Sequence, residues 1–411
     1  MSSSTHFRCR NWLTLLTSVG GLATVVACSS DTSSGGPTIT VGLLLPYTGY
    51  QAATTVNFEQ AVLYAADRIN STGGIQGYSV RVVAADTHSD PLMAKQSAIT
   101  LIDKGATVVI GPESAEIAPE ILPVLREHNV ALISPVVGAS ADSTVDCSEP
   151  WFRLAPSAQV LGRSLGKLVL QHGAKKIVIL ASTAAYDHAL SVAAGQEFGK
   201  GGFVLATEIV DNQAQTYASI IANTLSANPD AIVVAATPEA AALIVNEYST
   251  TVSKHAQWYF SPLLKTDLFI QNVDPNAIEG ALGVAPEVWD TGSDFVDAYS
   301  AQWAGVAPLE GADYFYDAVS ILGLALLKSN IGANGQVSFA SFNQSFFGAA
   351  GPPGTWVSWN DIEEGMNKSR NGESVYYSGL TGPIVLDSCG ARQIGSAGIW
   401  TVKNGSIVAA E

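Results

Sequence analysis

Polar side chains stand where buried, apolar stretches of the chain end. Gly111-Pro112-Glu113-Ser114 follows the apolar run 107–110 and directly precedes a segment with helical spacing. Free N–H groups at the start of a helix, together with the Ser114 hydroxyl, make a ready site for a carboxylate. The alternative is that Ser114 only caps its own helix. The pattern predicts either a ligand contact or a helix cap at this position.

Loops that follow strands supply the other candidates, because ligands of open α/β sheets bind beyond the carboxyl ends of the strands. Tyr47 and Tyr50 could stack on a ligand or only pack on the surface. Asp187 could meet a cation, although we expect it to be a solvated surface carboxylate. The candidate ligand contacts are Tyr47, Tyr50, Glu113, Ser114, Ala115, Val136, Gly138, Tyr186, Thr237, Pro262 and Leu263.

Signatures of catalysis are missing from the sequence. The segment 162–168, GRSLGKL, has three residues between its glycines where a phosphate loop needs four, and Leu168 stands where a magnesium-binding hydroxyl belongs. The six histidines are scattered without metal-ligand spacing, and we interpret His88 as a surface residue. We therefore expect no enzyme activity, no metal and no cofactor.

The elements that position these loops alternate between strand and helix. Apolar runs of strand length followed by segments with one apolar helical face predict parallel sheets covered on both sides. The rhythm runs once to residue 133 and restarts after residue 153, which predicts two similar α/β lobes. The expected strands are 38–45, 78–85, 107–110, 130–133, 176–180, 203–210, 231–235 and 257–260.

The last third of the chain is less regular. Residues 293–303 and 312–327 have helical spacing, and 381–386, 396–402 and 406–409 are typical of strands. The stretch 348–379 is rich in Gly, Pro, Trp and Asn, which predicts a loop with little regular structure. The acids Glu363 and Glu364 would be solvated in that loop.

The N-terminus has the pattern of an export signal. Arg8 and Arg10 precede an uncharged, mostly apolar stretch, and Val25-Val26-Ala27-Cys28 resembles the lipobox of bacterial lipoproteins. We expect residues 1–27 to be removed, Cys28 to be lipidated, and 28–37 to be a flexible tether, placing the protein in the periplasm or at the cell surface. The alternatives are an ordinary cleaved signal or an uncleaved anchor helix.

Composition limits the partners and the covalent links. The chain of 411 residues has a formal net charge of −16, which argues against binding to nucleic acid or to an anionic membrane surface. The length suits two domains. Of the four cysteines, Cys9 lies in the export signal and Cys28 is the expected lipidation site, which leaves Cys147 and Cys389 in an oxidising compartment. We expect a disulfide between these two, and the alternative is two buried thiols.

Several local patterns resemble the type I periplasmic binding proteins, close to the branched-chain amino-acid-binding proteins of ABC importers. The most specific is ADRINSTGGIQG, which is similar to a segment of that family. Together the matches keep the family's order along nearly the whole chain. They are LLPYTG (44–49), ADRINSTGGIQG (66–77), Asp86 with Asp90-Pro91, VIGP (109–112) with Ser114, ISP (133–135), Phe152-Arg153, YDAV (316–319), and GLTGPI (379–384) with Asp387 and Gly390.

The resemblance implies two lobes joined by three crossovers, with a small ligand bound between them by hinge closure. It implies lobe 1 from 38–150 plus 283–380 and lobe 2 from 151–282 plus 381–411. It also implies delivery of the ligand to an ABC transporter permease by a monomeric protein anchored only through its lipid. A ligand-sensing receptor module for a signalling partner is the alternative.

Departures from the family pattern bear on the ligand. The resemblance makes Tyr186 a pocket tyrosine, but Ser261-Pro262-Leu263-Leu264 has no carboxylate where such binders hold the α-amino group. Ala236-Thr237 replaces a tyrosine, and Gly138 falls near a contact threonine. An ammonium without a partner in an apolar pocket is costly. Aromatic carboxylates, small organic acids and short amides are therefore candidates beside amino acids.

Overall fold

The computed structural model describes residues 36–49, 51–114, 116–136, 151–251, 256–286, 293–392 and 397–410. Five of the residues singled out above, Cys28, Tyr50, Ala115, Gly138 and Cys147, lie outside the described residues. Within these ranges, none of the helices combines the length and the hydropathy of a membrane-spanning segment.

The first lobe is built on a five-stranded sheet in which all neighbouring strands are parallel. Seven of the eight residues of its second strand in order, Thr38–Leu45, are buried, as expected for a parallel strand covered on both faces. In spatial order the strands are β2 (Ser79–Asp86), β1 (Thr38–Leu45), β3 (Ala106–Ile110), β4 (Ala131–Ser134) and β5 (Trp151–Arg153).

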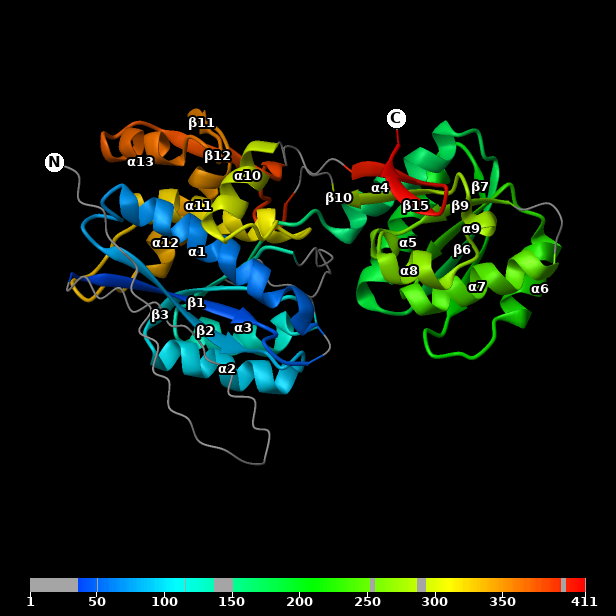
Figure 1. The fold of residues 1–411 in the computed structure, drawn as a ribbon, viewed down its shortest axis with the longest axis horizontal. Helices are drawn as coiled ribbons and strands as arrows, with labels where there is room; N and C mark the ends of the chain where they lie inside the picture. The colour runs from blue at the N-terminus through cyan, green and yellow to red at the C-terminus, as the bar shows by residue number, and fades with distance from the viewer. Residues whose placement is uncertain are drawn as a thin grey trace. The chain divides into compact units, whose positions relative to one another are not determined.

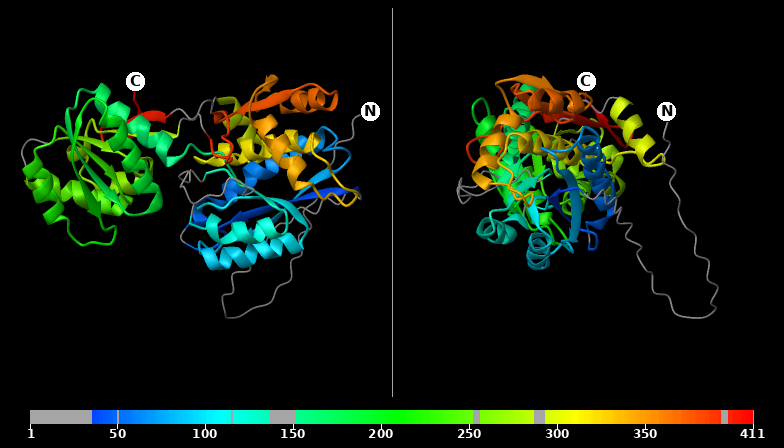
Figure 2. Two further views of the ribbon diagram at one scale, coloured as in Figure 1. Left: turned by 180° about the vertical axis from the view of Figure 1, so that it is seen from behind. Right: turned by 90° about the vertical axis from the view of Figure 1, so that its left-hand side faces the viewer.

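Helices cover both faces of this sheet, and alternate residues of β1 enter the two cores. Val41 and Leu43 pack with α1 (Thr55–Ser71) and α11 (Ala312–Leu327), whereas Leu44 packs with α2 (Pro91–Asp103) and α3 (Ala118–Glu127). Figure 1 shows α2 and α3 on one side of β1 and α1 and α11 on the other. The views in Figure 2 show the same covering, with cyan helices on one face of the blue strands and blue and yellow-orange helices on the other.

The second lobe is built on a seven-stranded sheet. Five strands are parallel, and the last two strands of the chain join its edge in antiparallel fashion. The order is β15 (Ser406–Ala409), β14 (Ala397–Lys403), β10 (Leu282–Pro286), β9 (Gln257–Phe260), β8 (Ala231–Ala235), β6 (Lys176–Ser182) and β7 (Phe203–Val210).

Two groups of helices cover the second sheet. One core contains residues of α4 (Ala158–Gln171) and α5 (Ala185–Phe198), and the other contains residues of α6 (Ala218–Ala227), α7 (Pro238–Thr251) and α8 (Asp267–Asn272). The short helices η2 (Pro262–Leu264) and α9 (Pro275–Ile278) follow β9 and α8. The predicted fold class, two α/β lobes with parallel sheets flanked by helices, is confirmed.

The lobe boundaries differ from those expected at three places. Residues 151–153 form β5 of the first sheet, although lobe 2 was expected to begin at 151. Residues 283–286 belong to β10, which pairs with β9 and β14, although 283 was expected to open the return to lobe 1. Residues 382–383 form β13, which pairs with β12 (Val375–Gly379), although lobe 2 was expected to resume at 381. An apolar run shows that a strand is buried but not which sheet it joins.

The expectation of an irregular loop over 348–379 is wrong. The stretch contains the end of α12 (Phe339–Ala350), then β11 (Thr355–Val357), α13 (Ile362–Arg370) and β12, and β11, β12 and β13 form a small third sheet. Ile362, Met366 and Ser369 are buried at helical spacing. Glu363 and Glu364 lie in the first turn of α13, where the helix dipole favours negative charge. Both Pro residues and two of the Gly residues of this stretch lie in the turn 351–354. The amino-acid composition of the whole stretch therefore did not indicate the helix α13 that follows the turn.

The chain passes between the two large sheets three times, after β5, after β10 and after β13, which agrees with the expected three crossovers. The first and third crossovers are bound to each other. Nη2 of Arg153 donates to the carbonyl of Cys389 (2.7 Å), and Nη1 of Arg392 donates to the carbonyl of Leu154 (3.0 Å). Cys389 is disulfide-bonded. Its expected partner Cys147 lies outside the described residues, so the pairing stays a prediction.

Candidate functional site

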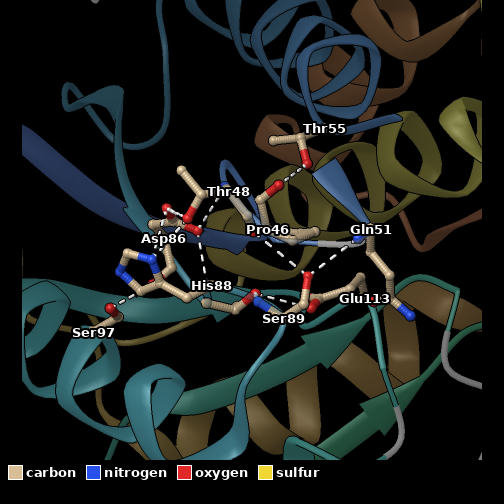
Figure 3. A network of polar contacts seen from close by, with 10 residues as sticks. Pro46, Thr48, Gln51, Thr55, Asp86, His88, Ser89, Ser97 and Glu113 are labelled. Atoms are coloured by element: carbon tan, nitrogen blue, oxygen red, sulfur yellow. Dashed lines mark hydrogen bonds and ion pairs between the residues drawn. The ribbon is translucent and has the colours of Figure 1, made fainter. Parts of the chain in front are cut away.

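The loops that follow β1 and β2 are joined by one carboxylate. Asp86, the last residue of β2, accepts the hydroxyl of Thr48 at Oδ2 (2.7 Å) and the backbone N–H groups of Thr48 (3.1 Å) and His88 (2.8 Å) at Oδ1. Figure 3 shows these residues converging from the two strand ends. Burial raises the pKa of Asp86, but these hydrogen bonds outweigh burial and bring the pKa below its ordinary value. Asp86 therefore has a structural role, which is to hold the loop that carries Tyr47.

In the loop after β1, the backbone at Gly49 leaves no room for a side chain. Gly49 has φ of +98°, and a Cβ atom there would lie 2.5 Å from the carbonyl oxygen of His88. The hydroxyl of Ser89 accepts the N–H of Gln51 (3.2 Å), and the hydroxyl of Thr48 hydrogen-bonds with Nδ1 of His88 (2.7 Å). The side chain of His88 is exposed, as expected from the sequence. Through its bond with Thr48 it also belongs to the hydrogen-bond network that fixes the loop.

Tyr47 and Glu113 lie at neighbouring strand ends. Tyr47 is partly buried against the first core, and burial, followed by the nearby charge of Glu59, raises its pKa. Glu113 follows β3 and accepts the hydroxyl of Thr87 at Oε1 (2.8 Å). Its Oε2 is buried and has no hydrogen-bonding partner among the described residues. Burial accordingly raises the pKa of Glu113.

Ser114 is used locally. Its Oγ accepts the N–H of Glu116 (3.3 Å), and α3 begins only at Ala118, although the sequence predicts a helix directly after Ser114. The hydroxyl therefore stabilises the turn before α3 and does not cap the helix, whose N-cap is Ile117. The contact of Ser114 with a ligand stays a prediction. Val136, after β4, is partly buried against the first core and lies 3.4 Å from the place a Cβ on Gly311 would occupy.

In the second lobe, Tyr186 and Asp187 begin α5. Tyr186 is partly buried, and burial, followed by the neighbouring Asp187 and Tyr314, raises its pKa. The expectation that Asp187 is a solvated surface carboxylate is wrong, because the residue is only 2% exposed. Ser182 donates its hydroxyl to Oδ2 of Asp187 (2.6 Å), and Oδ1 is buried without a partner in the described part of the chain. Burial raises the pKa of Asp187 as well.

The remaining candidates of the second lobe lie at helix starts. Thr237 caps α7, since its Oγ1 accepts the N–H of Ala240 (3.4 Å), while its own N–H donates to Oδ1 of Asn212 (3.2 Å) in the loop after β7. Pro262 is the first residue of η2, and Leu263 exposes 43% of its surface whereas the next residue, Leu264, is buried. Leu263 is therefore available for an apolar contact.

One buried carboxylate was missed from the sequence. Asp313 lies in the first turn of α11, is 4% exposed, and neither of its side-chain oxygens has a hydrogen-bonding partner among the residues described. A signal was present, because an acid stands near the start of a 16-residue helix that is otherwise almost entirely apolar. Acids are common in first turns, so the signal alone did not distinguish Asp313.

A pocket of about 790 Å³ lies elsewhere in the first lobe and is lined in part by residues of the third sheet. No candidate residue that the structure describes lines it. Nowhere in the described ranges do three His, Cys, Asp or Glu side chains gather as they would around a metal ion. We therefore build the candidate site on the strand-end loops, where buried polar atoms lack partners. The pocket is lined mainly by Phe295, Pro352, Trp356, Trp359, Tyr376 and Pro383.

Residues 38–404 match the model of a family described as periplasmic binding protein. Among curated relatives, the Leu/Ile/Val-binding protein BraC3 of Rhizobium johnstonii is 28% identical over 191 residues, which is 46% of this chain and 51% of the relative. The chain thus spans about half the length of the curated relatives it matches.

Solved structures share the fold over most of the chain. The substrate-binding protein LivJ from Streptococcus pneumoniae, a branched-chain amino acid transporter component in complex with isoleucine, has a TM-score of 0.67 and 20% identity, covering 91% of this chain and 99% of that chain. A solute-binding protein of an ABC transporter from R. palustris, in complex with benzoate, has a TM-score of 0.64 and 21% identity, covering 90% and 95%. At these identities the likeness establishes the fold alone.

Proposed function

The chain belongs to the periplasmic binding protein family, and from that premise we propose that it captures a small molecule outside the cytoplasm and delivers it to an ABC importer. In this function the two lobes close over the ligand by a hinge at the three crossovers. The proposal involves no catalytic step, since the matched family is one of binding proteins.

The observation that carries the proposal is a pair of buried carboxylate oxygens, one in each lobe, that have no hydrogen-bonding partner among the described residues. One is Oε2 of Glu113, a residue in the loop after β3 of the first sheet. The other is Oδ1 of Asp187, in the first turn of the helix that follows β6 of the second sheet. A buried polar atom without a hydrogen bond costs about 1–3 kcal/mol, more when it is charged. A ligand that donates to these oxygens would relieve that cost, so the loops around them are the proposed binding surface.

The ligand class follows from the side chains around those oxygens. Tyr47 and Tyr186 offer aromatic faces and hydroxyl groups, Thr237 and Ser114 offer hydroxyls, and Leu263 offers an exposed apolar contact. An amino acid or an amide-like compound fits this mixture, because its N–H groups can donate to the two oxygens. A small carboxylate fits where Glu113 or Asp187, whose pKa values burial raises, is protonated and donates instead. One structural neighbour is in complex with isoleucine and another with benzoate, which are an amino acid and a small carboxylate.

Anchoring and partners complete the proposal. Residues 1–27 act as a lipoprotein signal peptide, and Cys28 carries the lipid that holds the protein at a membrane. The mature protein acts as a monomer whose macromolecular partner is the importer permease. The formal net charge of the full chain, −16, disfavours nucleic acid as a partner.

A thermal-shift screen tests the proposal. The purified protein would be unfolded and refolded to strip any bound ligand, and then heated with amino acids, aromatic carboxylates, short organic acids, amides and sugars. A ligand at about 100 times its Kd adds about 2.7 kcal/mol to the free energy of unfolding, so a true ligand raises the melting temperature by several degrees. A saturable rise supports capture, and a folded protein that responds to no member of the panel contradicts the proposed ligand class.

A further inference from the structure

Asp313 is a buried carboxylate that the fold leaves unsatisfied. It lies in the first turn of α11, two residues after Gly311, and only 4% of its surface is exposed. Neither Oδ1 nor Oδ2 has a hydrogen-bonding partner in the described part of the chain. The ion pairs of those residues do not include it either. An ionised carboxylate in this state is strongly disfavoured unless something binds it.

The neighbouring acids Asp317 and Glu310 increase the free-energy cost of ionising Asp313. Burial, followed by the charge of Asp317, raises the pKa of Asp313 to about 7. The nearby backbone N–H groups of Tyr314 and of Asp313 itself oppose this rise but do not cancel it, and the charge of Glu310 adds to it. The guanidinium of Arg392 is near enough for Asp313 to influence its pKa, but it donates to the carbonyls of Leu154 and Pro383. Lys265 donates to Glu310 at 3.2 Å. None of the ion pairs that the structure gives for the described residues joins Arg392 or Lys265 to Asp313.

Asp317, one helical turn later, provides an internal comparison. It is fully buried, as Asp313 nearly is, yet its two oxygens accept four hydrogen bonds, from the hydroxyl of Tyr377, the N–H of Leu380, and the N–H and hydroxyl of Thr381. The fold therefore satisfies a buried acid on this helix where the acid is structural. The unsatisfied state of Asp313 needs another explanation.

The surroundings of Asp313 connect it to the candidate site. Gly311 packs beside Val136, the candidate residue after β4. Tyr314, the next residue of α11, contributes to the raised pKa of Tyr186, the candidate residue at the start of α5. Asp313 is thus flanked by neighbours of the proposed ligand contacts from both lobes.

We infer that Asp313 receives the ammonium group of the bound ligand, which makes the ligand a primary amine such as an amino acid and not an amine-free acid. This inference rests on the proposed ligand capture. An ammonium supplies three N–H donors and a positive charge, so it satisfies both carboxylate oxygens and removes the electrostatic cost of ionising Asp313.

The test uses matched ligand pairs on the purified full-length mature protein. Each pair contains an amine and its deaminated analogue, for example leucine with 4-methylpentanoate, phenylalanine with 3-phenylpropanoate, and benzylamine with toluene-saturated buffer. The variants are Asp313→Asn, which keeps the shape and removes the charge, and the control Asp297→Asn on the exposed face of α10 (Ser293–Gln302). Binding is measured by calorimetry and by thermal shift.

We expect the amine member of at least one pair to bind wild type and Asp297→Asn equally, and to bind Asp313→Asn at least tenfold more weakly. The ligand-free melting temperature of Asp313→Asn should not fall, because the variant loses an unsatisfied charge, and this measurement shows that it folds. Equal amine affinity in Asp313→Asn, or binding only of deaminated members, overturns the inference while leaving ligand capture intact. Failure of all ligands on folded wild type counts against the proposed capture itself.

Discussion

Thr381 and Asp317, 64 residues apart in the sequence, are joined by two hydrogen bonds of 2.8 Å. Thr381 donates its backbone N–H and its hydroxyl to the same oxygen, Oδ2 of Asp317. The link binds the chain just before the third crossover to the middle of α11. Two of the motifs that resemble the family, YDAV and GLTGPI, therefore meet in the core and are structural.

Replacing Thr381 tests this link. In Thr381→Val the hydroxyl is lost and Asp317, which is fully buried, keeps one acceptor site unfilled, so we expect the free energy of unfolding to fall by about 1–3 kcal/mol. Thr381→Ser keeps the hydroxyl and should stay much closer to wild type. Urea unfolding of the three proteins measures the effect, and equal losses in both variants would mean that the hydroxyl bond is unimportant.

Tyr186 is predicted to contact the ligand through its hydroxyl. The side chain packs partly against the core of the second lobe, so Tyr186→Phe is a cleaner test than truncation. We expect Tyr186→Phe to bind the ligand found by screening at least tenfold more weakly while its ligand-free melting temperature changes little. Tyr186→Ala should lose affinity and some stability together. An unchanged affinity in Tyr186→Phe would leave only the aromatic ring as a ligand contact.

Asp86 should make stability depend on pH. Its folded-state pKa is lowered by hydrogen bonds from Thr48 and His88 that outweigh burial. The contribution is therefore fully present above the unfolded pKa of about 3.9 and is lost as the pH falls through the folded-state pKa. We expect Asp86→Asn to lower the free energy of unfolding by about 1 kcal/mol at pH 7. The difference from wild type should shrink as the pH is lowered to 3, measured by urea unfolding, and a gap independent of pH would contradict the assignment.

Gly283 lies in a crowded place and Gly348 in an open one, so the same substitution by Ala should have opposite effects on stability at the two positions. A Cβ on Gly283 in β10 would lie 2.2 Å from the ring of Trp400, which is 2% exposed and donates Nε1–H to the carbonyl of Val284. We expect Gly283→Ala to lower the free energy of unfolding by about 1–3 kcal/mol or more through overpacking. Gly348 in α12 is exposed with open space around it, so Gly348→Ala should raise stability by about 0.5–1 kcal/mol. Thermal unfolding of both variants distinguishes crowding from a general effect of added methyl groups.

Cys28 is predicted to hold the protein at the membrane. Cys28→Ala should lack the lipid mass and should be found in the soluble fraction of cells, because no acyl chain remains to partition into the bilayer. Intact-mass analysis together with membrane fractionation measures both effects. A wild-type protein without lipid mass would instead favour an ordinary cleaved signal.

Much of the fold could be predicted from local patterns. The buried strand 38–45 and the helix 312–327 were expected at the residues where β1 and α11 are found, because burial on both faces leaves a continuous apolar run. The loops that carry Tyr47, Glu113, Tyr186 and Thr237 were located for a similar reason. Each follows directly from the end of a strand, and in a parallel sheet those ends share one edge.

The sequence by itself thus determined two α/β lobes, their strand-end loops and the family resemblance. Only the tertiary structure decided that β5 joins the first sheet and β10 the second, and that Asp187 is buried. It also decided that Asp317 accepts four hydrogen bonds while Asp313 has no hydrogen-bonding partner among the described residues. Periodicity and composition indicate the local secondary structure of a segment and which of its faces is buried. Strand partners, and the donors around a buried carboxylate, come from segments tens or hundreds of residues away, and local patterns hold no record of them.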